Sequence, residues 1–150
     1  MRINHPYGSK ERLFEMIHKV APATITEGLL PREKKREVIN QLVAFAREYL
    51  GLSSDDIHIE ISYDPKEAAQ MFSFGKQTPS TGIIRVVAAN RNLADVLRTL
   101  AHEMVHRKQQ VDGRLHIGAG DDGTEIENEA NAEAAIIMRR FGKANPIIFE

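Results

Sequence analysis

The stretch LRTLAHEMVHRKQQ (residues 97–110) carries two histidines four positions apart and a glutamate directly after the first of them. Residues four apart lie on one face of a helix, so His102 and His106 can both reach one metal ion. Glu103 follows the first histidine, where its carboxylate can reach a water molecule at that ion. This HExxH arrangement suits zinc, which lowers the pKa of the water, while the glutamate takes a proton as the water attacks a carbonyl.

The other residues of this helix indicate how the two histidines lie. At about 100° per residue, one side of the helix gathers an apolar stripe nearly opposite the histidines, made of Leu93, Leu97, Leu100 and Met104. More apolar residues extend this surface around much of the helix: Val96, Ala101 and Val105. Such a helix is buried on more than one side, so the sequence favours a metal site over two exposed surface histidines.

Composition narrows the classes of protein that fit. The 150 residues are 42% hydrophobic, enough for one core, so we expect a single domain over residues 1–150. Twenty basic and 21 acidic residues give no strong signal for nucleic-acid binding. There is no cysteine, so any metal must be held by His, Asp or Glu. Because the chain opens without an apolar signal segment and lacks a run of ~20 apolar residues, we expect a cytoplasmic protein with no membrane partner.

Hydrophobic periodicity predicts four helices. Apolar residues recur at helical spacing in four segments, residues 9–20, 31–50, 92–111 and 124–141. Pro31 suits a first helical turn, and Asn92 is a good N-cap. Gly51 and Gly142 stand where the second and fourth helices are expected to stop.

Three strands are predicted between the second and third helices. Residues 57–63 alternate apolar and polar side chains, residues 71–74 (MFSF) are a short apolar run, and residues 83–89 (IIRVVAA) are rich in β-branched side chains. The segment GKQTPSTG before the last strand is interpreted as a loop. This order predicts an α+β domain with N-terminal helices, a small sheet of about three strands, the HExxH helix and a C-terminal helix.

A catalytic zinc takes a third protein ligand, for which the sequence offers several candidates. Asp112 stands six residues after the second histidine, but the turn that would bring it to the metal needs a glycine where the chain has Gln109. His116, in the following loop, is another candidate. In the last helix, Glu127 and Glu133 border the apolar stripe on opposite sides, and helical geometry alone does not choose between them.

Residues 81–141 resemble small gluzincin-like metallopeptidases, the group that includes SprT-like and ImmA/IrrE-like domains and the minigluzincins. The resemblance is carried by TLAHEMVH (residues 99–106) and ENEAN (residues 127–131). In that group, LAHExxH follows a strand, and a later helix carries an E-x-E-A-N or E-x-x-x-D segment whose first glutamate is the third zinc ligand. The N-terminal half of the chain shows no such resemblance.

The resemblance implies a zincin-like fold and a set of site residues. The zinc ligands would be His102, His106 and Glu127, and Glu103 would be the general base. Asn131 would orient a ligand histidine from outside the ligand set.

The resemblance also implies a function, a zinc-dependent metallopeptidase acting on a protein or peptide. The segment 83–89 would be an edge strand, to which an extended peptide can add through main-chain hydrogen bonds. His116, Tyr63 and Arg85 are candidates for stabilising the oxyanion, and their spacing does not decide between them. Two alternatives stay open: a catalytically silent metal-binding domain that acts as a regulator or assembly component through protein binding, and a helical interaction protein without metal.

Two further features of the C-terminal region have more than one interpretation. Thr124 and Glu127 have the spacing of a capping box, in which the carboxylate would turn back onto the helix N-terminus. Glu129 is a further acid on the same helix. The tail ANPIIFE (residues 144–150) either packs its apolar triplet onto the core or lies in the cleft near the metal.

Overall fold

A computed structural model describes residues 31–71, 74–78, 81–114 and 124–149. The helix expected at residues 9–20 and the candidate His116 lie outside this part of the chain. The described elements make an α+β fold, in the order α2 (Arg32–Leu50), β1 (His58–Ser62), α3 (Glu67–Met71), β2 (Gly75–Thr78), β3 (Ile83–Val87), α4 (Leu93–Val111) and α5 (Glu125–Ala144). Short 3-10 turns follow α2, at Ser54–Asp56, and α5, at Pro146–Phe149.

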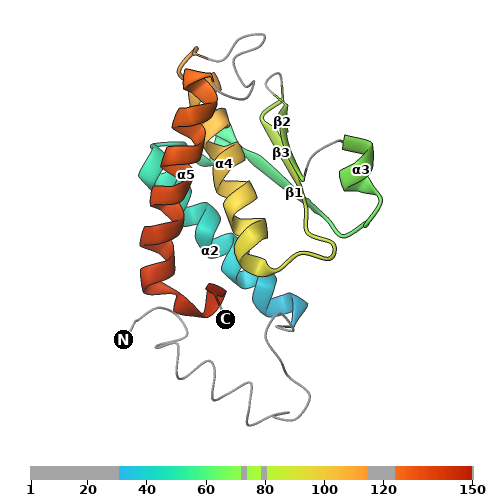
Figure 1. The fold of residues 1–150 in the computed structure, drawn as a ribbon. Coiled ribbons are helices and arrows are strands. Elements are labelled where there is room, and N and C mark those ends of the chain that lie inside the picture. The colour runs from blue at the N-terminus through green and yellow to red at the C-terminus, as the bar shows by residue number, and fades with distance from the viewer. Residues whose placement is uncertain (1–30, 72–73, 79–80, 115–123, 150) are drawn as a thin grey trace.

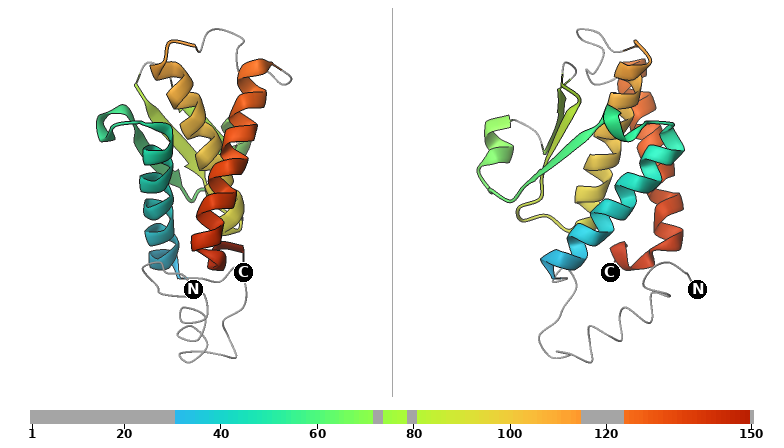
Figure 2. Two further views of the ribbon diagram at one scale, coloured as in Figure 1. Left: turned by 90° about the vertical axis from the view of Figure 1, so that its left-hand side faces the viewer. Right: turned by 180° about the vertical axis from the view of Figure 1, so that it is seen from behind.

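Helix α4 lies at the centre of the described structure. Figures 1 and 2 show the sheet on one side of α4 and α5 on another, with α2 packed alongside both helices. Helix α4 contacts α2, α5, β2 and β3. The predicted apolar stripe is buried, and so are Val96, Ala101 and Val105 outside it. The prediction that this helix is buried on more than one side is therefore confirmed.

The ends of the long helices follow their sequence signals, with one exception. The Asn92 side chain accepts a hydrogen bond from the N–H of Asp95 (2.9 Å) at the start of α4. Gly51 ends α2 in the left-handed conformation, at φ 74°, which glycine adopts without strain. The expectation that Gly142 stops the last helix was wrong, because α5 continues to Ala144. Gly142 is buried inside the last turn, where a methyl group would collide with the ring of Phe149.

The sheet is mixed, with strand order β1-β3-β2. Strand β1 runs parallel to β3, with His58 opposite Ile83, and β2 runs antiparallel to β3, with Gly75 opposite Val86. The expectation that the segment 83–89 is an edge strand was therefore wrong, since β3 is paired on both sides. Its buried side chains suit that central position.

The second strand lies at Gly75–Thr78, and its predicted position was wrong for Met71 and Phe74, the two described residues of the segment 71–74. Met71 instead ends α3, a short helix that the sequence pattern did not predict. The start of α3 is fixed to the sheet by Glu67, which accepts a hydrogen bond from the Ser62 hydroxyl (2.6 Å) and forms an ion pair with Arg85. Strand β2 and helix α3 thus depend on contacts with β1 and β3 more than on local residue preferences.

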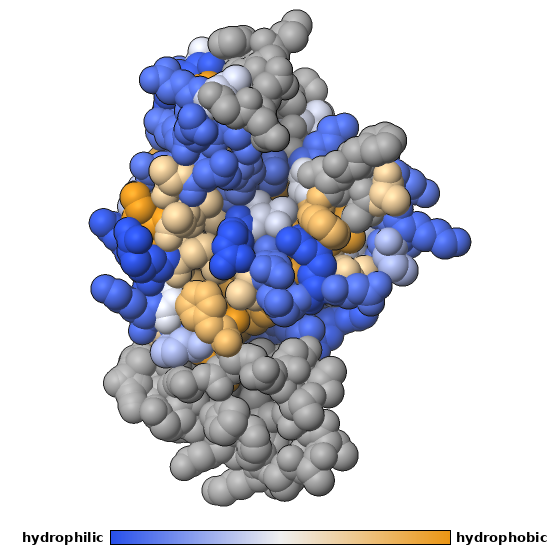
Figure 3. All heavy atoms as spheres, viewed as in Figure 1, coloured by the Kyte–Doolittle hydropathy of each residue, from blue (hydrophilic) through white to orange (hydrophobic). Residues whose placement is uncertain are grey.

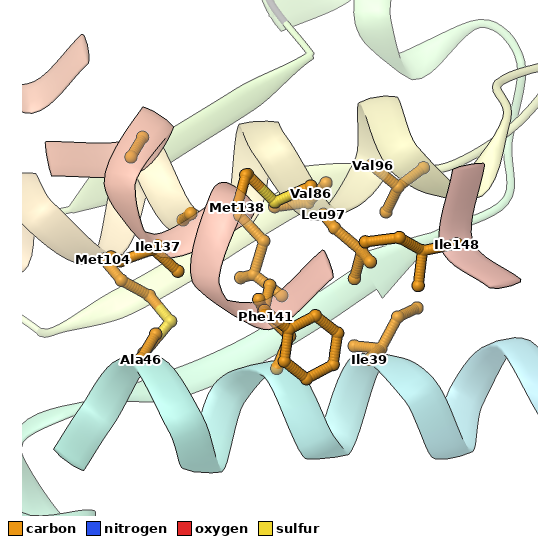
Figure 4. Packing of buried hydrophobic residues seen from close by; sticks show 14 of the residues in the cluster. Ile39, Ala46, Val86, Val96, Leu97, Met104, Ile137, Met138, Phe141 and Ile148 are labelled. Carbon is orange, nitrogen blue, oxygen red and sulfur yellow. The ribbon is translucent and has the colours of Figure 1, made fainter. Parts of the chain in front are cut away.

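The C-terminal tail belongs to the core. Ile147 and Ile148 are 3% and 4% exposed, and Figure 4 shows Ile148 beside Val96 and Leu97 of α4. The first interpretation of the tail, packing on the core, is confirmed for these two residues. Hydrophilic residues cover much of the face in Figure 3, and apolar side chains reach the surface near the C-terminal end of α5. No helix in the described ranges combines the length and apolar character of a membrane span.

Candidate metal centre

The structure brings His102, His106 and Glu127 together between α4 and α5. The Nε2 atoms of the two histidines are 3.1 Å apart. One carboxylate oxygen of Glu127 lies 3.0 Å from Nε2 of His106, and the other lies 3.1 Å from Nε2 of His102. The three side chains are between 11% and 19% exposed, so the cluster is largely shielded from solvent.

Donor atoms at these distances fit one divalent ion. Zinc binds imidazole nitrogen and carboxylate oxygen at about 2.0–2.2 Å, so atoms that share it in a near-tetrahedral set lie roughly 3.3–3.6 Å apart, close to the separations here. Two imidazoles and one carboxylate are also a ligand set of catalytic zinc, which leaves a fourth position for water. The group could therefore hold a metal ion.

Helix packing explains why these three side chains meet. The two histidines are four residues apart on α4, and Glu127 lies in the first turn of α5, where α5 packs against α4. The small buried side chains of Ala130 and Ala134 let the two helices approach closely. Thr124 caps α5 by accepting a hydrogen bond from the Glu127 N–H (3.2 Å), while the carboxylate of Glu127 lies against the histidines. The capping interaction and the candidate metal site are thus compatible.

Glu103 lies beside the cluster in a pocket of about 300 Å³, lined by Phe74, Gly75, Arg98, Thr99, His102 and Glu103. Burial raises the pKa of the Glu103 carboxyl to about 7, with the negative charge of Glu127 acting in the same direction and His106 against it. Burial also lowers the pKa of His102, and His106 adds to this, although Glu127 and a hydrogen bond with Asn131 oppose it. The predicted partner Asn131 does contact a candidate ligand.

Strand β2 approaches α4 directly at Glu103. A Cβ atom on Gly75 would lie 2.5 Å from Cγ2 of Thr99 and 3.1 Å from Cγ of Glu103, so only glycine fits without a shift of the strand or the helix. Thr99 is held in turn by Arg91, which donates to its hydroxyl (2.8 Å). The Arg91 guanidinium also stacks on the ring of Phe74, 4.2 Å from its centre. These contacts fix one wall of the pocket.

The other candidate ligands are engaged elsewhere. Asp112 pairs with Lys108 (3.2 Å) at the end of α4. Glu133 accepts a hydrogen bond from the Tyr49 hydroxyl (2.7 Å) on α2. Glu129 accepts one from Gln109 (2.7 Å) and therefore lies next to the cluster without joining it.

Two candidates for oxyanion stabilisation also have other partners. Arg85 forms ion pairs with Glu60 and Glu67, and its hydrogen bonds hold the pKa of Glu67 down to about 2. The guanidinium of Arg32 lies over the ring of Tyr63, with its Cζ atom 4.2 Å from the ring centre. The structure brings neither of them to the candidate metal ligands.

One residue at the centre was not singled out from the sequence. The side chain of Gln109, 1% exposed, contacts Nδ1 of His106 through Oε1 (2.8 Å). Its Nε2 donates to the carbonyl oxygen of Ile126 (3.0 Å) and to Glu129. The available signal was its spacing, because a polar residue three positions after a ligand histidine lies on the same helical face.

Comparison with known proteins adds no relative: no family model matches the chain, and neither the curated proteins nor the solved structures contain a match. The candidate site therefore rests on its own geometry.

Proposed function

We propose that this chain is a zinc-dependent peptidase with a zincin-like fold, similar to the small gluzincins. The observation that carries the proposal is the cluster of two histidines and Glu127 beside a buried carboxylate, that of Glu103. The α+β fold, with the HExxH helix packed between a small sheet and the helix that carries the third ligand, also supports it.

Zinc in this site would act as a Lewis acid and lower the pKa of a water molecule in contact with it. Glu103 would take the proton of the attacking water on its carboxylate and deliver it to the amide nitrogen as the C–N bond breaks. Burial raises the pKa of this carboxyl to about 7 in the metal-free chain, which favours uptake of a proton by Glu103. His102 and His106 hold the metal, and Asn131 and Gln109 contact these histidines from behind.

Strand β2 is the proposed docking edge for an extended substrate. It is the last strand in the order β1-β3-β2, so one of its two edges faces away from β3. Gly75 also brings the strand against Glu103, next to the pocket that contains His102. A peptide added along β2 would use main-chain hydrogen bonds for affinity, and the pocket would accept a side chain.

The proposal is tested by metal content and hydrolysis measured together. Protein purified without added metal should contain close to one zinc per chain and should cleave unfolded casein. A chelator should abolish cleavage, and one equivalent of zinc should restore it, because the histidines and Glu127 hold the ion that activates water. Protein that contains one zinc per chain but leaves casein and a mixed peptide library intact would contradict the proposal. The chain would then be interpreted as a metal-binding domain that acts by protein binding.

A methyl group at Gly75 should reduce hydrolysis without removing the metal. In Gly75→Ala, the Cβ atom would meet Thr99 and Glu103, so β2 or the carboxylate must move. Misplacement by about 1 Å can cost up to roughly 10²-fold in rate, and we expect a loss of that order with unchanged zinc content.

A second substitution provides the control. Thr99→Ser removes the Cγ2 atom that lies 2.5 Å from the added methyl but keeps the hydroxyl that accepts from Arg91. The double variant Gly75→Ala with Thr99→Ser should therefore hydrolyse the substrate faster than Gly75→Ala and regain a large part of the lost rate. Wild-type activity in Gly75→Ala alone would contradict the idea that close approach of β2 to Glu103 matters.

A further inference from the structure

We infer that Gln109 is a positioning residue for the metal centre: its amide keeps a proton on Nδ1 of His106 and leaves the Nε2 lone pair for the metal. The same amide holds the first turn of α5, which carries Glu127. The inference rests on the metal site of the proposed function but does not depend on hydrolysis.

The orientation of the amide follows from its neighbours. At one end it faces the carbonyl oxygen of Ile126 at 3.0 Å and the Glu129 carboxylate at 2.7 Å. A backbone carbonyl can only accept a hydrogen bond, and the Glu129 oxygen at this contact also accepts one from Arg114 (2.8 Å). The NH₂ group must therefore face these two acceptors. A flipped amide would place oxygen against oxygen at both contacts.

This orientation leaves the amide oxygen facing His106. Oε1 lies 2.8 Å from Nδ1 of the ring, and an amide oxygen can only accept, so Nδ1 must carry the hydrogen. In the neutral ring, the other nitrogen, Nε2, then carries the lone pair, and it is the atom that lies 3.0 Å from Glu127 and 3.1 Å from His102. In metal sites, the hydrogen bond made by one ring nitrogen commonly fixes the ligand role of the other.

A charged pair anchors the outer end of this chain of contacts. Arg114 donates to the same oxygen of Glu129 (2.8 Å) that accepts from Gln109. The carboxylate polarises the amide, and the amide polarises the imidazole, which makes Nε2 of His106 a better donor to a cation. Because Gln109 also bonds to Ile126, one residue before Glu127, a single buried side chain fixes ligands on both helices.

Gln109→Leu tests the inference, with Gln110→Leu as the matched control. Leucine keeps much of the buried volume but cannot accept from His106 or donate to α5. Gln110 is the next residue of the same helix and accepts from Arg107 (3.0 Å), away from the ligands. We expect the affinity for zinc, measured by competition with a chromogenic chelator, to fall by about 10- to 100-fold in Gln109→Leu and to stay unchanged in the control.

The readout separates a positioning role from a merely structural one. If Gln109 served only packing, Gln109→Leu would lower the melting temperature of the metal-free protein and leave its zinc affinity at the wild-type value, and that result would overturn the inference. If wild-type protein binds zinc tightly but does not cleave casein, the proposed function would be contradicted and this inference would stand.

A measurement on the unmodified chain covers the case in which the variant does not fold. In ¹⁵N-labelled, metal-free wild-type protein at pH 8, NMR should show a proton on Nδ1 of His106 that exchanges slowly with solvent. A lone pair on Nδ1 would contradict the inference. Where Gln109→Leu does fold, the same proton should exchange much faster, because its acceptor is gone.

Discussion

Replacing Glu103 by glutamine should lower the rate of peptide hydrolysis by a factor of about 10² or more, with the zinc content unchanged. Glutamine has nearly the same shape as glutamate, but its amide cannot take a proton from water. The metal is expected on the histidines and Glu127, whose donor atoms this change does not touch. Initial rates on a fluorogenic peptide and zinc per chain should be measured on the same preparation.

A matched substitution shows whether the effect belongs to the site. Glu48 is exposed on α2, so Glu48→Gln makes the same chemical change away from the pocket and should hydrolyse the peptide at the wild-type rate. Zinc-loaded Glu103→Gln that works as fast as the wild type would mean that another group takes the proton, and the assigned mechanism would have to be abandoned.

Alanine at His102, His106 or Glu127 should remove the increase in melting temperature that zinc produces in the wild-type protein. An ion that binds only the folded chain stabilises it by about 2.7 kcal/mol when its concentration is 100 times Kd, and this gain disappears with the site. Thermal unfolding with and without zinc, together with zinc per chain, measures both effects. We expect all three variants to lose most of their metal.

The controls for the ligands lie in the same chain. His58 is exposed on β1, and Glu125 is exposed in the first turn of α5, so alanine at either position should keep the zinc-dependent increase in melting temperature. Glu133→Ala should keep it too, because this change removes a hydrogen bond with Tyr49 and leaves the candidate ligands in place, so it distinguishes the two acids that helical geometry left open. Full zinc binding by Glu127→Ala would show that the third ligand had been assigned to the wrong residue.

The long helices could be predicted because their information is local. In α4, the apolar stripe, the N-cap Asn92 and the histidine spacing all lie within one segment, and the structure has each of them as expected. Helix α2 likewise ends at the glycine, Gly51, that the sequence marks. Signals of this kind do not depend on what packs against the helix.

The second strand could not be predicted, because its information is tertiary. The apolar run at residues 71–74 suggested a strand, whereas β2 is built from Gly75, Lys76, Gln77 and Thr78. Pairing with β3 provides its hydrogen bonds, and contact with Thr99 and Glu103 requires its glycine. Neither reason is visible in a window of neighbouring residues.

Only part of the candidate site could be predicted, because some of its information is local and the rest is tertiary. Two candidate ligands and the candidate base came from one short stretch of helix, but Glu127 and Glu133 were equivalent by spacing, and only the resemblance favoured the first. In the structure, the packing of α2 places Tyr49 next to Glu133. Gln109 was overlooked because a buried amide is recognised by its partners, and these lie on another helix.

The cap of α5 has a consequence for metal affinity. First turns of helices fray, and a molecule whose first turn is frayed does not present Glu127 to the histidines. The apparent Kd equals the intrinsic Kd divided by the fraction of molecules in the competent state. A threonine cap stabilises a helix end by about 1 kcal/mol, a factor of roughly five in such an equilibrium. By keeping this turn folded, the hydroxyl of Thr124, which accepts from the Glu127 N–H, raises the competent fraction and so contributes to metal affinity without touching the metal.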